Sequence, residues 1–147
     1  MKKGLFMKKL MAIVFTLAII ICGMPVIKIK AALMPTLTYC GHVQDYGWQG
    51  LVKNGETAGS TGNSKRLEGV KIYLTDEYGN SIVTYRTHVQ DEGWQSWKSS
   101  GKVAGTTGKL KRLEAIQIKL NGNYANQYDI CYRVHVGGKG WLEWTKN

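Results

Sequence analysis

Beyond residue 32 the sequence lacks any long hydrophobic run, and it lacks any apolar pattern with the 3.6-residue period of an amphipathic helix. It also lacks a glycine-rich phosphate loop ahead of a helix, a nucleophile elbow and the ligand spacing of a metal site. These absences argue against a helical fold and against the common nucleotide-dependent, hydrolytic and metal-dependent activities. We therefore predict an all-β protein with no catalytic residues, no metal and no cofactor.

Cysteine is scarce, and of the three in the chain only Cys40 and Cys131 lie beyond residue 32. Each is next to a tyrosine that opens a repeated segment, Tyr39 or Tyr132, and in repeat coordinates the two cysteines are two positions apart. Side chains two apart along a strand lie on the same face. A disulfide joining the first and last copies is therefore possible, because secretion permits one. Two small buried apolar side chains are the alternative.

The first 32 residues differ from the rest and predict a signal peptide over 1–32. Lysines before residue 10 precede an apolar run over 10–27, and Ala31-Ala32 supplies a small-residue end. The run is barely long enough to span a bilayer, so a retained N-terminal anchor is the alternative. A lipoprotein cleaved before Cys22 is disfavoured, because the bulky Ile21 stands where such a site requires a small residue.

Positive charge is concentrated in this leader. It holds six of the 20 basic residues and none of the 10 acidic ones, which leaves the remainder with a net charge of +4. A mildly cationic domain favours an anionic wall or surface but falls well short of a nucleic-acid footprint. We expect no nucleic-acid partner, and contact with a membrane only through the leader if it is uncleaved.

One segment occurs twice, and its opening occurs a third time. The copies span 39–74, 85–120 and, in part, 132–147. The first two align without a gap at an offset of 46, and the third keeps the opening at an offset of 47. The first two share the strings H-V-Q-D-x-G-W, A-G-x-T-G and K-R-L-E-x-x-x-I-x-L. Self-similarity at this period is the signature of a repeat architecture.

These strings resemble the ChW repeat, the clostridial hydrophobic repeat with a central tryptophan. The resemblance covers two whole copies and the opening of a third, in effect all of the chain after the leader. It implies an extracellular module of a secreted or cell-surface protein of Gram-positive type. It implies little chemistry, because the role of the family is described only loosely, as surface attachment or macromolecule binding.

Within one copy the pattern predicts strand, turn, strand, turn, strand. Residues 82–90 alternate in side-chain type, and 113–120 is the clearest strand, with Ile116 and Ile118 on one face. A copy of this size cannot bury its apolar face alone, so copies must pack on each other. About two and a half copies over 36–147 fit a pseudo-threefold β-prism or β-trefoil, with an open stack of small sheets as the alternative.

The chain ends within the third copy. Either its hairpin completes the sheet begun at Tyr39, or the third copy is interrupted. The residues leave both interpretations open.

One tryptophan position is present in every copy, at Trp48, Trp94 and Trp141, each directly after a glycine. Tryptophan carries a large apolar surface, and its indole N–H requires a partner when buried. We expect this position to be the core anchor of each copy, with ligand contact as the second interpretation.

A second tryptophan position holds Trp97 and Trp144, where the first copy has Leu51. Such variation is typical of a solvent-facing contact residue. Flat rings beside polar neighbours, such as Gln95, would stack on a sugar face while the rim forms hydrogen bonds. These residues are the candidate ligand-binding side chains.

Two further sets of repeated residues favour structural roles. His42, His88 and His135 occur one per copy, but no carboxylate or thiol keeps step with all three, which favours rings packed in the sheet over a zinc site. Glu68 and Glu114 each lie near an arginine on the same face, so a repeated ion pair is simpler than the paired carboxylates of a glycosidase.

We therefore expect a secreted, non-catalytic β-repeat module that binds an extracellular polymer, either a cell-wall component or an environmental polysaccharide, through exposed aromatic side chains. The alternative is an adhesion or assembly module that uses open strand edges to bind another extracellular protein. An enzyme such as a wall hydrolase is the third and least favoured class.

Overall fold

The computed structural model describes residues 35–147, and the predicted signal peptide lies outside the described residues. This part of the chain is all β apart from one 3-10 segment, which confirms the predicted fold class. None of its helices is long and apolar enough to cross a membrane. In chain order the elements are β1 (Thr38–Val43), β2 (Gly47–Trp48), β3 (Val52–Lys53), β4 (Leu67–Tyr73), β5 (Val83–Val89), β6 (Gly93–Trp94), β7 (Lys98–Ser99), β8 (Ala104–Gly105), β9 (Leu113–Leu120), η1 (Gly122–Asn126), β10 (Cys131–Tyr132), β11 (His135–Val136), β12 (Gly140–Trp141) and β13 (Thr145–Lys146).

The two whole copies, repeat 1 (39–74) and repeat 2 (85–120), fold alike. In each, a long first strand pairs on one edge with two short strands and on the other edge with a long last strand, all antiparallel. The registers agree, since His42 faces Trp48 as His88 faces Trp94. A bulge follows the histidine in both. The predicted order of strands and turns is confirmed.

Repeat 2 also contributes a strand to the sheet of repeat 1. β8 pairs with β4, with Gly105 opposite Gly69 and Ala104 opposite Val70. The approach is close enough that a Cβ on Gly105 would lie 2.4 Å from the carbonyl oxygen of Glu68. Glycine is required there for a second reason, because its φ of +104° lies in the left-handed region. The A-G-x-T-G string is therefore the segment by which one copy packs on the copy before it.

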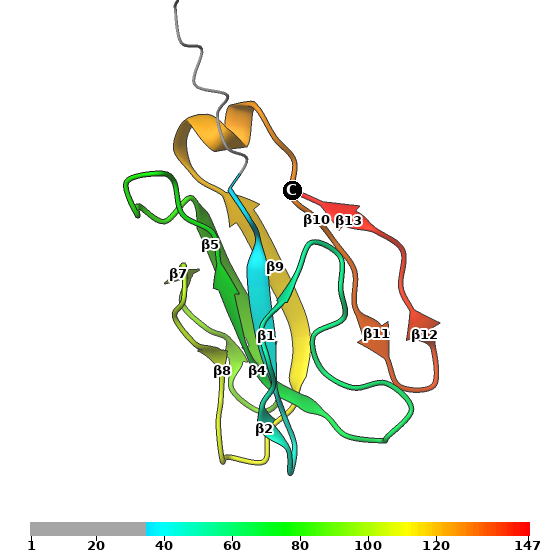
Figure 1. The fold of residues 1–147 in the computed structure, drawn as a ribbon. Helices are drawn as coiled ribbons and strands as arrows, with labels where there is room; N and C mark the ends of the chain where they lie inside the picture. Colours follow the sequence, from blue (N-terminus) through cyan, green and yellow to red (C-terminus); the bar gives the residue numbers. More distant parts are fainter. Residues whose placement is uncertain (1–34) are drawn as a thin grey trace, which may run out of the picture. The chain divides into compact units, whose positions relative to one another are not determined.

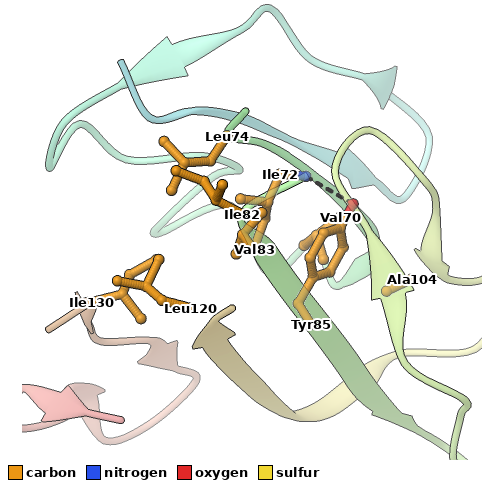
Figure 2. Close-up of a cluster of buried hydrophobic side chains, with 9 residues drawn as sticks. All are labelled: Val70, Ile72, Leu74, Ile82, Val83, Tyr85, Ala104, Leu120 and Ile130. Atoms are coloured by element: carbon orange, nitrogen blue, oxygen red, sulfur yellow. Dashed lines mark hydrogen bonds between the residues drawn. The ribbon is translucent and has the colours of Figure 1, made fainter. Parts of the chain in front are cut away.

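The core lies between the two sheets and is built from alternate residues of their long strands. On β5 every second side chain is fully buried, including those of Val83, Tyr85 and Val89. Figure 2 shows Tyr85 lying beside Ile72 and Val70 of repeat 1, with a hydrogen bond from the Ile72 backbone N–H to the Tyr85 hydroxyl, 3.0 Å long. The packing of copy on copy, expected from the size of one copy, is thus visible in its contacts.

The third copy forms a hairpin of its own (131–146, "the third hairpin"), shown in red tones in Figure 1. Its strands pair only with each other, β10 with β13 and β11 with β12. The interpretation in which this hairpin completes the sheet begun at Tyr39 is therefore wrong. The sheets of residues 35–147 are separate and none of them closes, so the pseudo-threefold prism or trefoil stays a prediction.

The two cysteines do not pair. Cys40 is buried in β1, Cys131 is exposed in β10, and both are free thiols. The strands β1 and β10 lie in different sheets, so nearby positions in the repeat do not bring the two sulfurs together. The disulfide is therefore absent, and the alternative of two buried apolar side chains holds for Cys40 but not for Cys131.

Candidate binding surface

The clearest cluster of aromatic and charged side chains lies on the outer face of repeat 2. Because Tyr85 and Thr87 point into the core, Arg86 and the residues in phase with it point outward. The guanidinium carbon of Arg86 lies 4.9 Å from the ring centroid of Trp94 and 4.7 Å from that of Trp97. The ammonium of Lys119 lies 4.3 Å from the Trp97 centroid. At these distances cations and indoles attract each other.

The third hairpin reproduces this cluster. The guanidinium carbon of Arg133 lies 4.8 Å from the ring centroid of Trp141 and 4.8 Å from that of Trp144. His135 meets Trp141 edge-on at 5.4 Å, as His88 meets Trp94 at 5.5 Å. We call this arrangement, an arginine between the two tryptophans of a copy, the Trp–Arg–Trp cluster.

Repeat 1 lacks the Trp–Arg–Trp cluster because it lacks two of its residues at once. Cys40 stands at the arginine position and Leu51 at the second tryptophan position. Trp48 keeps its edge contact with His42, at 5.3 Å, and Lys71 lies over its ring at 4.3 Å. The arginine and the second tryptophan are thus present together in two copies and absent together from the other.

A model of one protein family, described as Clostridial hydrophobic W, matches residues 42–76 and 88–122. The chain carries two ChW repeats. Such repeats are typical of secreted and surface proteins. A search of curated proteins and a search of solved structures each found no match. The third hairpin lies outside the two matched ranges but keeps the histidine, arginine and tryptophan geometry of the second ChW repeat.

The tryptophan that is present in every copy is not a core anchor in two of its three occurrences. Trp94 and Trp141 are 42% and 43% exposed, and only Trp48 is partly buried. The register is the same in all three copies, each ring lying opposite a histidine, and Trp48 differs in lying beside Gly69 with Lys71 over its ring. In repeat 2 the core anchor is instead Tyr85, whose burial raises its pKa.

The second tryptophan position faces solvent, as predicted. Trp97 is 39% exposed and Trp144 is 57% exposed. The Trp97 ring is covered in part by the side chains of Arg86 and Lys119, whereas Arg133 lies over the Trp144 ring. Trp144 therefore offers the more accessible ring for stacking.

Gln95, the polar neighbour expected to bind a ligand, has a structural task. Its side-chain amide donates to the carbonyl oxygen of Gly105 at 3.2 Å, and its oxygen accepts from the Gly105 N–H at 2.7 Å. These two bonds fix β8 to the segment between β6 and β7 of the same repeat. We leave Gln95 out of the candidate surface for this reason.

The repeated histidines and glutamates form one linked pair per whole ChW repeat. His88 Nδ1 lies 3.1 Å from Glu114, which accepts a hydrogen bond of 2.6 Å from Arg112. In repeat 1, Glu68 accepts a bond of 2.9 Å from Arg66, and His42 Nδ1 lies 3.3 Å from it outside hydrogen-bonding geometry.

The arginine–glutamate ion pairs are thus confirmed. Within residues 35–147 no three histidine, cysteine or acidic side chains gather in a way that could hold a metal ion.

The tryptophans lie outside two hollows in the protein surface. Two surface hollows, of about 290 and 220 Å³, lie near the end of β4 and around Tyr124 and Tyr128, and no tryptophan lines either. The tryptophans of the two clusters are 39–57% exposed, so the clusters present open faces, which suit an extended polymer better than an enclosed small molecule.

The arginines of the clusters were missed from sequence. The available signal was their joint presence with the second tryptophan in copies 2 and 3 and the joint loss of both in copy 1.

Proposed function

We propose that this ChW protein is a secreted, non-catalytic module that binds an extracellular polymer, a cell-wall component or another polysaccharide, through its two Trp–Arg–Trp clusters. The observation that carries the proposal is the exposed Trp144 ring, which lies beside the guanidinium of Arg133. An indole face provides apolar contact for a sugar ring, and its cationic neighbour favours an anionic substituent.

The position of the arginines refines the chemistry of the ligand. Arg86 and Arg133 are ordered by stacking on rings, so little side-chain entropy remains to be lost when a ligand binds. Arg86 already donates from Nε to Gln117, at 2.8 Å, which leaves its terminal nitrogens for an incoming oxygen. A glycan with spaced carboxylate or phosphate groups fits such a surface better than a neutral one.

The absence of catalysis is proposed from the environments of the acidic residues. Glu68 is buried in β4 and Glu114 is exposed in β9, so the two carboxylates lie in separate sheets, and each is paired with an arginine. Acid–base chemistry requires two carboxyl groups with unlike environments in one cleft. The two glutamates instead form ion pairs on the faces of their own sheets.

The test is retention of the purified protein on insoluble cell-wall and polysaccharide preparations. Trp144→Ala and Trp97→Ala should each weaken binding about tenfold, because each removes one stacking surface. The matched control is Tyr78→Ala, since Tyr78 is 82% exposed in the turn between β4 and β5, away from either cluster.

Two further arms separate the contributions. Retention should be greater on anionic than on neutral preparations, and Arg133→Ala should reduce that preference. Melting temperatures must stay within a few degrees of the parent protein for a loss to count as loss of binding. Equal retention of the parent and the double tryptophan variant would remove the support for the proposal.

A further inference from the structure

One edge of the third hairpin is open. β10 and β11 pair with β13 and β12 on one side, and no other strand in residues 35–147 pairs with them. In the ChW repeats the equivalent strands, β1 and β5, have both edges paired. An edge with unpaired N–H and C=O groups is a template for another strand.

The third hairpin is otherwise a complete copy of the first half of repeat 2. Tyr132 lies opposite Thr145 as Tyr85 lies opposite Lys98, and the histidine–tryptophan pairing is also retained. The turn keeps its hydrogen bond too, from Lys139 N–H to the Val136 carbonyl, 3.0 Å long. The open edge therefore has the shape that in repeat 2 accepts β9.

The ChW repeats show what chemistry covers such an edge. In repeat 2 the covering strand is β9, whose aliphatic side chains alternate toward the core and whose Glu114 carboxylate reaches His88. The equivalent histidine of the third hairpin, His135, is exposed and lies on the edge where that carboxylate would arrive. A matching strand therefore brings an acidic residue followed by alternating aliphatic residues.

The apolar side chains on the inner face of the third hairpin are also uncovered. Val134 and Leu142 are both exposed, whereas Thr87, at the place equivalent to Val134, is fully buried in repeat 2. Val136 is only partly buried, although its counterpart Val89 is completely buried. Apolar side chains and an unpaired edge are thus left open together, at the place where the repeat pattern puts one more strand.

We propose that the open edge of the third hairpin binds an extended segment of another polypeptide, which adds to it as an antiparallel strand. The partner segment has the pattern of β9, an acidic residue that meets His135 followed by aliphatic residues at every second position. Strand addition of this kind draws affinity from backbone hydrogen bonds and specificity from alternate side chains.

A second copy of this chain is a poor source of that strand. Its two segments of this pattern, β4 and β9, are already paired in their own sheets, and releasing either would expose the core residues Val70, Ile72 or Leu120. A strand of another polypeptide, one not already paired in a sheet of its own, therefore fits this edge better than a second copy does.

The test uses a fluorescein-labelled synthetic peptide with the sequence of residues 109–122 as the probe, titrated with the purified protein and followed by fluorescence anisotropy. Saturable binding is expected. A control peptide with aspartate at the positions of Ile116 and Ile118 should bind at least about a hundredfold more weakly, because it cannot present an apolar face.

A double-mutant cycle then tests the register. With the parent protein, a Glu114→Gln peptide should bind about two- to fivefold more weakly than the unmodified peptide. With His135→Ala protein, the two peptides should bind equally. A cycle without coupling, or binding that survives the aspartate substitutions, would overturn the proposal.

Failure to bind up to the solubility limit of the peptide would overturn it as well. So would light scattering that shows a dimer which the peptide does not dissociate, because a second copy would then occupy the edge. None of these results bears on retention by polysaccharides, which depends on the tryptophan variants.

Discussion

The hydroxyl of Tyr85 joins the two ChW repeats, and its removal should destabilise the protein more than the same change in repeat 1. The hydroxyl accepts from the Ile72 N–H of repeat 1 and donates to the Lys102 carbonyl of repeat 2, while the ring is fully buried. Tyr85→Phe leaves both backbone groups without this partner. Loss of the buried bond from Ile72 costs about 1–3 kcal/mol and loss of the partly buried bond to Lys102 about 0.5–1.5 kcal/mol, so we expect the free energy of unfolding to fall by about 2–4 kcal/mol.

Tyr39 supplies the matched control, because it holds the equivalent position in repeat 1. Its hydroxyl also binds two backbone groups, the Glu56 carbonyl and the Gly55 N–H, but both bonds are exposed to water. Solvent replaces such bonds, so Tyr39→Phe should cost only about 0.5–1 kcal/mol. Urea denaturation followed by tryptophan fluorescence measures both variants.

The same tyrosine predicts how stability changes at alkaline pH. Burial raises the pKa of Tyr85 above the ordinary tyrosine value of 10.0. Above that pH the unfolded chain loses the proton while the native state retains it, so stability falls as pH rises further. Tyr85→Phe should show a shallower fall. Equal destabilisation by the two phenylalanine variants, together with unchanged alkaline slopes, would refute the assignment of Tyr85 as the link between repeats.

Two other perturbations have clear expected outcomes. Gly105→Ala should lower the free energy of unfolding by about 2–4 kcal/mol, because its Cβ would meet the backbone of repeat 1. The control is Gly59→Ala, which has a similar φ of +108° but no backbone within 3.4 Å and should cost about 1 kcal/mol. Equal losses by chemical denaturation would contradict the close approach of β8 to β4. In the native protein, a thiol reagent should label Cys131 rapidly and Cys40 only on unfolding, since Cys40 is buried and burial raises the pKa of its thiol. A cross-link between the two cysteines in non-reducing electrophoresis would show the assignment of free thiols to be wrong.

The strands and their faces were predictable because they follow from local patterns. The alternation of Ile116, Ile118 and Leu120 identifies the buried face of β9, and duplication of the whole segment predicts that copies pack together. The repeated string K-R-L-E also predicted the arginine–glutamate pairs, since residues two apart on a strand share a face.

The sequence could not show which face each tryptophan takes. Trp94 follows a tight turn, and its orientation depends on the register that sets it opposite His88, with a bulge directly after that histidine. A shift by one residue would have turned the ring into the core. The pairing of β8 with the neighbouring repeat was equally hidden, because Ala104 and Gly105 carry no strand pattern of their own.

The transfer of β8 into the first sheet means that the unit of duplication and the unit of folding are out of phase. A polypeptide cut after residue 76 would retain every residue of the first family match yet lose the strand that finishes its sheet. Exchange of the β4 amides that face β8, unlike those paired with β1, should accordingly slow only when residues 104–105 are present. If the protein grew by duplication of whole segments, each complete new copy would supply the strand that finishes the sheet of the copy before it.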